Sequence, residues 1–484
     1  MFKIDNDTRL LKHNVLQRVS ELAYQGKLCD DTIQEIPFEQ IPGRQPHFRC
    51  CVYKEREIIH QRVRLAMGKM PNGMSERTAA VCVIPAACEG CPIQRYTVTE
   101  NCQKCVAKKC MHACPFGAIS MSGRGAYIDP NKCRECGRCA AACPYSAIAD
   151  LVRPCRKACP VGAIEIGDDK LADIDDDKCI SCGACMKACP FGAISDRAQI
   201  LNVINEFKAG HQVIAMFAPA LEGEFGAGVP VAKLKKALEQ LGFEKAYEVG
   251  LGADAVAMAE AEELLEHLKA GLKMTTSCCP AFVNMIRKHF PRLQANVSTT
   301  VSPMVALSRW VREKYPQAKV VFIGPCVAKK TEQVEGGPDY VLTTEEIVAM
   351  MDARKIDPDK MEADPVQESS TYGKGFASSG GVTSAVMQVI QEMGEVPQVS
   401  AQRCNGAAEC KKALMMLQAG KFDMDFIEGM ACTGGCIGGA GCLTHGEKNK
   451  AEVDKYGREA FEKTISDALS VLIQPTDKSS DAGK

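Results

Sequence analysis

The pattern of apolar and polar residues divides the chain near Arg197. Before that point cysteines are frequent, and after it they become sparse and apolar runs recur at regular spacing. In the second part, short runs typical of buried strands alternate with stretches that have the period of an amphipathic helix. Strands are expected at 212–217 and 319–323, and helices at 232–241, 253–268 and 380–393. This alternation predicts an α/β fold with a mainly parallel sheet, in which chemistry lies where strands meet loops.

The same pattern predicts four regions. Residues 1–95 contain amphipathic stretches and are expected to be mostly helical. Residues 96–200 form a cysteine-rich repeat, and residues 201–447 form the α/β region. Residues 448–484 are expected to form a C-terminal helix followed by a polar, disordered tail.

Composition changes this picture chiefly through the 28 cysteines among 484 residues. No apolar run approaches the roughly 20 residues that span a bilayer, and no export signal is visible, so we expect a cytoplasmic protein without a membrane role. Thiols stay reduced in that compartment, and dense cysteine then indicates metal ligation rather than disulfides. The net charge of -1 gives no global field that would attract nucleic acid.

The cysteines of the repeat follow the CxxCxxCxxxCP run of bacterial ferredoxins. Two copies are complete, a third has two extra residues between its second and third cysteines, and a fourth is degenerate. In that order they are Cys133, Cys136, Cys139 and Cys143; Cys179, Cys182, Cys185 and Cys189; Cys102, Cys105, Cys110 and Cys114; and Cys155 with Cys159. CxxC pairs also make zinc sites, but evenly spaced cysteines ending in Cys-Pro favour 4Fe-4S clusters.

In a two-cluster ferredoxin the fourth cysteine of each run binds the other cluster. The expected sets are Cys102, Cys105, Cys110 and Cys143; Cys133, Cys136, Cys139 and Cys114; and Cys179, Cys182, Cys185 and Cys159. Cys155 and Cys189 then remain as half of a possible fourth site, which Cys88 and Cys91 could complete. Cys29, Cys50, Cys51 and Cys82 have no ligand spacing and are interpreted as buried or free thiols.

Three further cysteine motifs lie in the α/β region: TSCCP at 276–280, GPCVAKK at 324–330 and MACTGGC at 430–436. In this order, and behind ferredoxin-type repeats, they resemble the signatures of the iron-only (FeFe) hydrogenases. The resemblance implies α+β ferredoxin-like cluster repeats in 96–200. It also implies a catalytic H-domain in 201–447, an α/β domain of two lobes with mainly parallel sheets around the H-cluster.

The resemblance also implies roles for individual residues. Cys279, Cys326, Cys432 and Cys436 would ligate the 4Fe-4S part of the H-cluster, and Cys436 would bridge to a diiron subsite that carries CO, cyanide and a dithiolate bridge. Cys278 would exchange protons with that subsite, and Lys329 would hydrogen-bond a cyanide. Pro219, Phe376 and Met430 would line the diiron pocket, and Glu260, Ser298 and Glu263 would relay protons from solvent. Without the resemblance, acids on such a helix would be interpreted as solvated and Lys329 as a surface lysine.

The implied activity is the reversible reaction 2H+ + 2e- = H2, with a ferredoxin-like electron carrier as partner and maturation proteins for the diiron site. Alternatives of the same ancestry are a non-catalytic iron-sulfur assembly protein and an H2 sensor. Gly324, Met304, Thr433 and Ala440 depart from the best-known members and indicate a branch similar to the group B hydrogenases of anaerobic bacteria. Cys404, Cys410 and Cys442 are interpreted as structural thiols.

Overall fold

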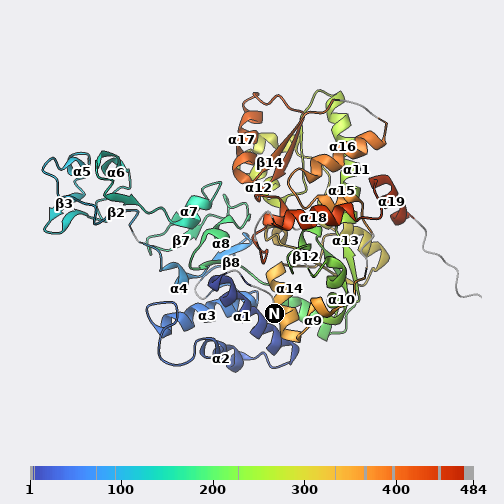
Figure 1. Cartoon of the computed structure of the whole chain (residues 1–484), viewed down its shortest axis with the longest axis horizontal. Coiled ribbons are helices and arrows are strands. Elements are labelled where there is room, and N and C mark those ends of the chain that lie inside the picture. The colour runs from blue at the N-terminus through green and yellow to red at the C-terminus, as the bar shows by residue number, and fades with distance from the viewer. Residues whose placement is uncertain are drawn as a thin grey trace, which may run out of the picture.

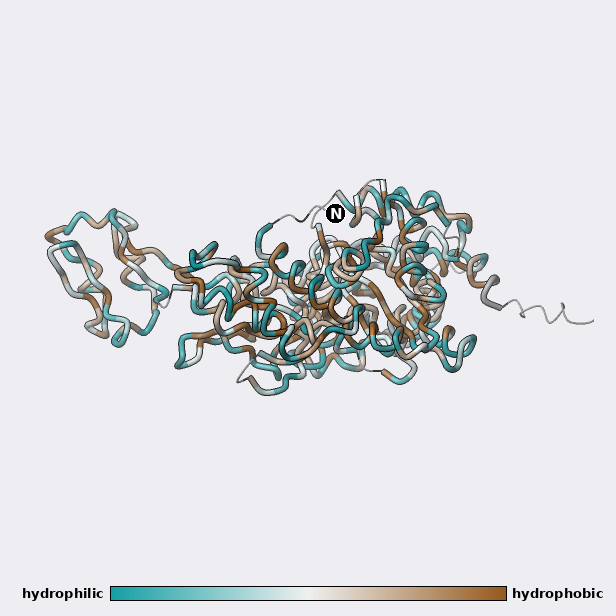
Figure 2. Tube along the Cα trace, turned by 90° about the horizontal axis from the view of Figure 1, so that it is seen from below, coloured by the Kyte–Doolittle hydropathy of each residue, from teal (hydrophilic) through white to brown (hydrophobic). Residues whose placement is uncertain are grey.

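A computed structural model describes residues 4, 6–71, 74–92, 94–226, 228–332, 334–364, 368–394, 398–444 and 448–473 of the chain. Figure 1 shows a large body and a small module, around helices α5 and α6, that projects from one end of it. In Figure 2, turned by 90°, the same module again stands clear of the body. Across the described residues, no helix is both long and apolar enough to cross a membrane. The tail predicted to be disordered, 475–484, lies outside the described residues.

Helices make up most of the N-terminal region. They are α1 (Asp7–Tyr24), α2 (Asp30–Gln40) and α3 (Val52–Ala66). Asn6 caps α1, because its side chain accepts a hydrogen bond from the backbone NH of Arg9. Val15 and Val19 lie on the buried face of α1, which packs against α14 (Thr344–Arg354). The N-terminal helices therefore share a core with the body.

The cysteine repeat folds into two small modules of short helices and antiparallel strand pairs. The outer module contains β2 (Tyr96–Val98), α5 (Lys109–His112), β3 (Ile119–Ser122), β4 (Gly125–Ile128), α6 (Arg138–Ala142) and β5 (Ile148–Asp150). The inner module contains α7 (Pro154–Ala158), β6 (Ile164–Ile166), β7 (Ala172–Ile174), α8 (Ala184–Ala188) and β8 (Ile194–Asp196). Strand β8 pairs with β1 (Val81–Val83), which is followed by α4 (Pro85–Cys88). A segment that precedes the repeat therefore completes the inner module.

The body contains two parallel sheets, which confirms the prediction of mainly parallel sheets. One has the order β10-β9-β12-β13 and the other the order β11-β15-β14. Their strands are β9 (Val213–Phe217), β10 (Lys245–Glu248), β12 (Lys319–Ile323), β13 (Tyr340–Leu342), β11 (Met274–Thr275), β14 (Ala401–Asn405) and β15 (Phe426–Met430). β9 and β15 are buried throughout, because both faces of a parallel sheet are covered by helices.

Helices connect these strands as the alternating pattern requires. They are α9 (Ile200–Lys208), α10 (Val231–Leu241), α11 (Gly250–Lys269), α12 (Pro280–His289), α13 (Pro303–Lys314), α15 (Thr371–Gly375), α16 (Gly381–Glu392) and α17 (Ala407–Gln418). Single 3-10 turns are η1 (Pro219–Leu221), η2 (Pro291–Asn296), η3 (Ala328–Thr331), η4 (Pro358–Lys360) and η5 (Cys436–Gly438). The strands and helices predicted individually correspond to β9, β12, α10, α11 and α16, and those predictions are confirmed.

The expectation of one C-terminal helix was wrong for the described part of 448–484. Two helices, α18 (Lys448–Arg458) and α19 (Ile465–Ile473), stand there instead. Thr464 caps the N-terminus of α19, because its hydroxyl accepts a hydrogen bond from the backbone NH of Asp467 at 3.1 Å. A local cap therefore overrides a continuous helical pattern.

Candidate active site

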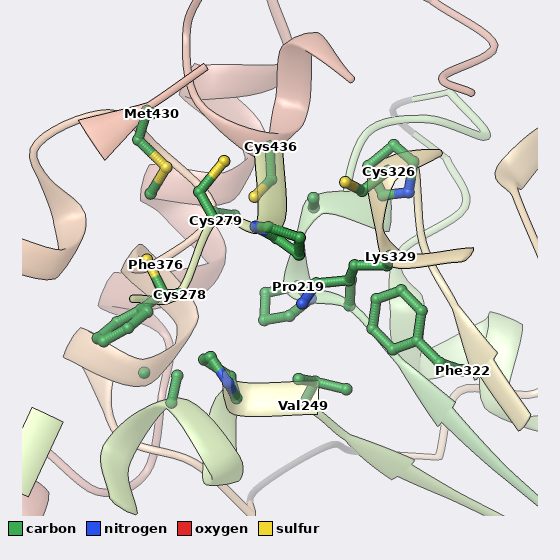
Figure 3. A pocket seen from close by; sticks show the side chains of 18 residues that line it. Pro219, Val249, Cys278, Cys279, Phe322, Cys326, Lys329, Phe376, Met430 and Cys436 are labelled. Atoms are coloured by element: carbon green, nitrogen blue, oxygen red, sulfur yellow. The ribbon is translucent and has the colours of Figure 1, made fainter. Parts of the chain in front are cut away.

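A cavity of about 80 Å³ lies among the carboxyl ends of the parallel strands. Pro219 follows β9, Pro325 and Cys326 follow β12, Cys278 follows β11, and Met430 ends β15. Figure 3 shows the side chains from these turns directed into one space. Strand-to-loop junctions of both sheets thus form a single site, as expected for open parallel sheets.

Four cysteines predicted to bind one cluster gather beside this cavity. Cys279 caps α12, Cys326 follows β12, and Cys432 and Cys436 flank the glycine turn after β15. Burial raises the pKa of the Cys326 thiol to about 11 and that of Cys436 to about 12, and repulsion from nearby thiols adds to both. Burial also raises the pKa of Cys432 well above its usual range, with Cys326, Cys279 and Cys436 among its electrostatic neighbours. The four cysteines, each partly buried, therefore gather in one group beside the cavity.

The glycine turn between Cys432 and Cys436 lies close to the backbone of another segment, around Ser379. Gly435 has a φ of +89°, and a Cβ atom there would lie 2.6 Å from the backbone nitrogen of Ser379. A side chain at this position would therefore be strained in conformation and in space. The site fits an iron-sulfur cluster, because buried thiols that resist ionisation alone become thiolates when iron binds them.

Cys278 lines the same cavity and has an acid close to it. The thiol is buried, and burial, followed by repulsion from Glu260, raises its pKa well above the usual range. Glu260 is fully buried, and burial raises its pKa to about 7. One of its oxygens, Oε1, accepts hydrogen bonds from the backbone NH of Ser277 at 3.0 Å and from the Ser277 hydroxyl at 3.3 Å. The other, Oε2, has no partner among the described residues.

A second acid lies one helical turn further out. Ser298 donates a hydrogen bond from Oγ to Oε2 of Glu263 at 2.6 Å, and Glu263 is only partly buried. Ser277 also donates to the carbonyl of Thr300, and the Thr300 backbone NH donates to Ser298 Oγ at 3.2 Å. Ser277 and Thr300 thus join the two halves of the predicted relay. Neither residue was predicted from the sequence, although Ser277 directly precedes the cysteine pair of TSCCP.

Lys329 reaches the cavity from η3 and is 9% exposed. Its ammonium group lies 3.2 Å from Ser302 Oγ and 3.2 Å from Glu332 Oε2. Burial alone would lower the pKa of Lys329, but attraction to Glu332 and to the thiols of Cys326 and Cys436 raises it above the usual value. The lysine therefore places a positive charge beside Cys326 and Cys436, and it is not a solvated surface residue.

The three residues predicted to line the pocket, Pro219, Phe376 and Met430, all line the cavity (Figure 3). Phe322 also lines it, and this residue was not anticipated. A Cβ atom on Gly324 would lie 2.7 Å from the ring of Phe322, so the ring occupies the space of a side chain at position 324. Met304 is buried but does not line the cavity, whereas its neighbour Pro303 does.

The cysteines of the inner module form two groups. Cys159, Cys179, Cys182 and Cys185 line one cavity of about 20 Å³. In the second group, burial raises the pKa of Cys155 to about 11, and electrostatic interactions with Cys189, Cys88 and Cys91 add to this rise. Cys88 accepts a hydrogen bond from the backbone NH of Ala172 at 3.3 Å, a bond that suits a ligand sulfur. The residues proposed for the third and fourth clusters are therefore brought together.

The cysteines of the outer module follow the same arrangement. Cys110 interacts electrostatically with Cys143 and Cys102, and Cys139 with Cys133 and Cys114. In every copy of the repeat, the sulfur of the last cysteine accepts a hydrogen bond from the backbone NH four residues later. These bonds, at 3.2 to 3.4 Å, join Ala118 to Cys114, Ala147 to Cys143, Ala163 to Cys159 and Ala193 to Cys189.

The remaining cysteines lie outside these groups. Cys404, Cys410, Cys442 and Cys82 are buried, and Cys29, Cys50 and Cys51 are exposed. Cys410 donates a hydrogen bond to the Met430 carbonyl at 3.5 Å, and Cys442 donates one to Ile437 at 3.3 Å. In the part of the chain that the structure describes, no three His, Cys, Asp or Glu side chains are arranged to hold a single metal ion.

Comparison with protein families matches three parts of the chain. Residues 211–440 match the family described as iron only hydrogenase large subunit, C-terminal domain. Residues 172–195 match the 4Fe-4S binding domain, and residues 101–147 match the 4Fe-4S dicluster domain.

Three similar relatives have hydrogenase names. Iron hydrogenase 1 of Clostridium pasteurianum is 31% identical over 68% of this chain and 66% of its own length. The periplasmic Fe hydrogenase large subunit of Nitratidesulfovibrio vulgaris is 32% identical over 65% of this chain and 85% of its own length. The NADP-reducing hydrogenase subunit HndD of Solidesulfovibrio fructosivorans is 29% identical over 48% of this chain and 50% of its own length. The chain thus spans about two thirds of the first relative and half of HndD.

Solved structures add little to this. A chain from a study of FeFe-hydrogenase oxygen inactivation has a TM-score of 0.49 at 21% identity, over 57% of this chain and 93% of that one. A likeness of that size supports no argument.

Proposed function

The chain belongs to the iron-only hydrogenase family, and from that premise we propose that it catalyses 2H+ + 2e- = H2 at an H-cluster. The observation that carries the proposal is the convergence on one cavity of Cys279, Cys326, Cys436, Cys278 and Lys329. A polyferredoxin would need only the first part of the chain. A non-catalytic relative would not need a proton-exchanging thiol and a buried ammonium group at the same cavity.

Cys279, Cys326, Cys432 and Cys436 are proposed to hold the 4Fe-4S part of the H-cluster, with Cys436 also bound to the diiron subsite. When bound, that subsite, with its CO, cyanide and dithiolate ligands, supplies the metal centre at which H2 is formed or split. The protein's own contribution is a dry, mostly apolar pocket, which strengthens every charge interaction inside it. Lys329 supplies a fixed positive charge for an anionic ligand, and the diiron unit would be inserted by maturation proteins.

Protons are proposed to pass between solvent and Cys278 through Glu263, Ser298 and Glu260. Glu263 is partly exposed and bonded to Ser298, whereas Glu260 is buried beside Cys278. A pKa of about 7 lets Glu260 take up and release protons near neutrality. The free Oε2 atom of Glu260 is available for the transfer, since Oε1 is held by Ser277.

Electrons are proposed to pass through four 4Fe-4S clusters, carried by α+β ferredoxin-like modules. The sets run in the order Cys102, Cys105, Cys110, Cys143; Cys133, Cys136, Cys139, Cys114; Cys88, Cys91, Cys155, Cys189; and Cys159, Cys179, Cys182, Cys185. Electrostatic contacts support the inner steps, since Cys185 interacts with Cys155, and Cys182 interacts with Cys279. The proposed external partner is a ferredoxin-like carrier. The name of HndD makes an NADP-linked partner a second candidate.

Infrared spectroscopy of anaerobically matured protein tests the proposal. We expect bands from CO and cyanide ligands, together with H2 evolution from reduced methyl viologen. Matured protein that showed neither the bands nor turnover would exclude the hydrogenase and leave the assembly protein as the better interpretation.

A further inference from the structure

The loop from Cys102 to Cys110 lies at the far end of the outer module. In Figure 1, α5, which begins at Lys109, lies farther from the body than α6, and Figure 2 shows this module at one extremity of the molecule. The opposite cluster loop, which contains Glu135, faces the inner module, because Glu135 lies 3.8 Å from Arg156 of α7. The Cys102 loop is thus the cysteine loop most remote from the cavity.

One position in each cluster loop shows what the loop contacts. In each loop, the position just before the second cysteine of the CxxC pair has a positive φ value. The residues at this position are Lys104 (+52°), Glu135 (+53°) and Ser181 (+58°). The shared backbone conformation gives the three loops the same local shape. Glu135 contacts the inner module, and the buried Ser181 Oγ accepts a hydrogen bond from the Ala80 backbone NH at 3.2 Å. At both inner loops, this position therefore contacts the neighbouring part of the chain.

At the outer loop the same position has no neighbouring module to contact. Lys104 is exposed, and its ammonium group donates to the Gly123 carbonyl of its own module at 2.5 Å. The two residues added to this copy of the repeat lengthen the loop to Cys110, and its tip carries Val106, which is 97% exposed. Lys108 and Lys109 follow and are exposed as well. An apolar tip surrounded by lysines is a feature that the other two cysteine loops lack.

Charge indicates the kind of partner. Residues 101–128 contain four Lys or Arg residues and no Asp or Glu, although the whole chain has a net charge of -1. A second copy of this chain would bring like charges together at this loop, which is unfavourable. A carrier with an acidic surface would be attracted to it, and its approach would be accelerated by the opposite charge.

We propose that the Cys102–Cys110 loop is the docking surface for a small, acidic one-electron carrier protein. Val106 packs against the carrier, and Lys104, Lys108 and Lys109 pair with its carboxylates. Each electron then passes between the redox centre of the carrier and the cluster of the Cys102 set, with no bond made or broken. This inference rests on the proposed function, because it assumes an outermost cluster that exchanges electrons with a partner.

The test compares Lys108→Glu/Lys109→Glu with a matched charge reversal on the body, Lys412→Glu/Lys421→Glu, where both lysines are also exposed. Calorimetry with an acidic two-cluster 4Fe-4S ferredoxin at low salt gives Kd without requiring turnover. We expect Kd to rise about tenfold for the loop variant and to stay unchanged for the body variant. Val106→Ser should weaken binding about threefold, a smaller effect because it removes only apolar contact. Raised salt should weaken wild-type binding more than binding by the loop variant.

Turnover then separates this inference from the proposed function. With reduced ferredoxin, the loop variant should need about tenfold more carrier for half-maximal rate, while its rate with methyl viologen stays at the wild-type value. Equal Kd values for the loop variant and wild type would overturn the docking surface. An equal loss of ferredoxin affinity in the loop variant and the body variant would overturn it as well. A change in the sedimentation of the loop variant alone would assign the loop to a second copy and overturn it too. Wild-type protein that is inactive with methyl viologen contradicts the proposed function, whereas the Kd values still decide the docking surface.

Discussion

The two ends of the proposed electron path differ in burial although both are built from cysteines. At the outer end, the cysteines of the Cys102 set are only partly buried, and the strands of the module are three or four residues long. At the inner end, Cys278 is buried, and the cavity is enclosed by two parallel sheets with strands of up to five residues. Exposure suits electron exchange with a carrier, because the carrier must approach the cluster. Burial suits chemistry on protons, because it isolates the acid and the thiol from bulk water.

Substituting the cavity thiol should produce the largest effect. Cys278→Ala removes the group proposed to exchange protons at the metal site and leaves the four proposed ligands in place. We expect the infrared bands to remain and turnover with methyl viologen to fall by about three orders of magnitude.

A second buried thiol provides the control for that experiment. Cys404→Ala removes a sulfur of similar burial that lies outside the proposed ligand and proton-transfer groups. It should cost about 1 kcal/mol of unfolding free energy and leave the rate within about twofold. Full activity in Cys278→Ala would show that protons reach the cavity by another route.

Substituting the buried acid should produce the next largest effect. Glu260→Gln keeps the shape of the side chain and most of its bonds to Ser277 but cannot exchange a proton. We expect a loss of about a hundredfold in H2 evolution with methyl viologen. Glu262→Gln, on the same helix and exposed, is the matched control and should retain wild-type activity. Similar rates in both variants would contradict the relay.

The raised pKa of Glu260 also predicts opposite pH dependences for the two directions of turnover. Above pH about 7 the carboxyl group is ionised and cannot donate, so H2 evolution should fall as the pH rises through that value. Below it the group is protonated and cannot accept, so H2 uptake should fall as the pH is lowered. The stability of the fold should also depend on pH, because the folded state binds the Glu260 proton more tightly than the unfolded chain does. Its contribution to stability should decrease by roughly 3 kcal/mol between pH 4.5 and pH 7, and Glu260→Gln should abolish that change.

The motifs predicted which cysteines and lining residues lie together at the cavity, because their spacing is local and three short signatures carry it. The contacts of Ser277 and Thr300 could not be predicted, since a serine and a threonine far apart in sequence show no periodic signal. Phe322 fills the space beside Gly324, and this too could not be predicted, because it depends on how the side chains pack. The break between α18 and α19 was missed because a capping bond at Thr464 competes with a weak helical pattern.

Removing a cluster from the middle of the path should have an intermediate effect. Cys155→Ser replaces a thiol of the set proposed to contain Cys88, Cys91 and Cys189, and Cys50→Ser, at an exposed cysteine, is the control. We expect the first variant to contain one 4Fe-4S cluster fewer per chain by iron and sulfide analysis. Ferredoxin-linked turnover should fall about tenfold, because the gap for electron transfer is lengthened. Unchanged iron content would reduce the count of accessory clusters to three.

The smallest effect is expected where the inner cysteine module meets the body that contains the cavity. Ala440, one of the departures from the family pattern, is buried, and a Cβ atom on Gly183 would lie 2.3 Å from its own Cβ atom. Its methyl group thus packs against the turn between Cys182 and Cys185 and does not line the cavity. Ala440→Gly should therefore cost about 1 kcal/mol of unfolding free energy and change neither the infrared bands nor the rate by more than about twofold. A shift in those bands would instead mean that this junction tunes the diiron site, so that the exposed and buried ends of the path are coupled.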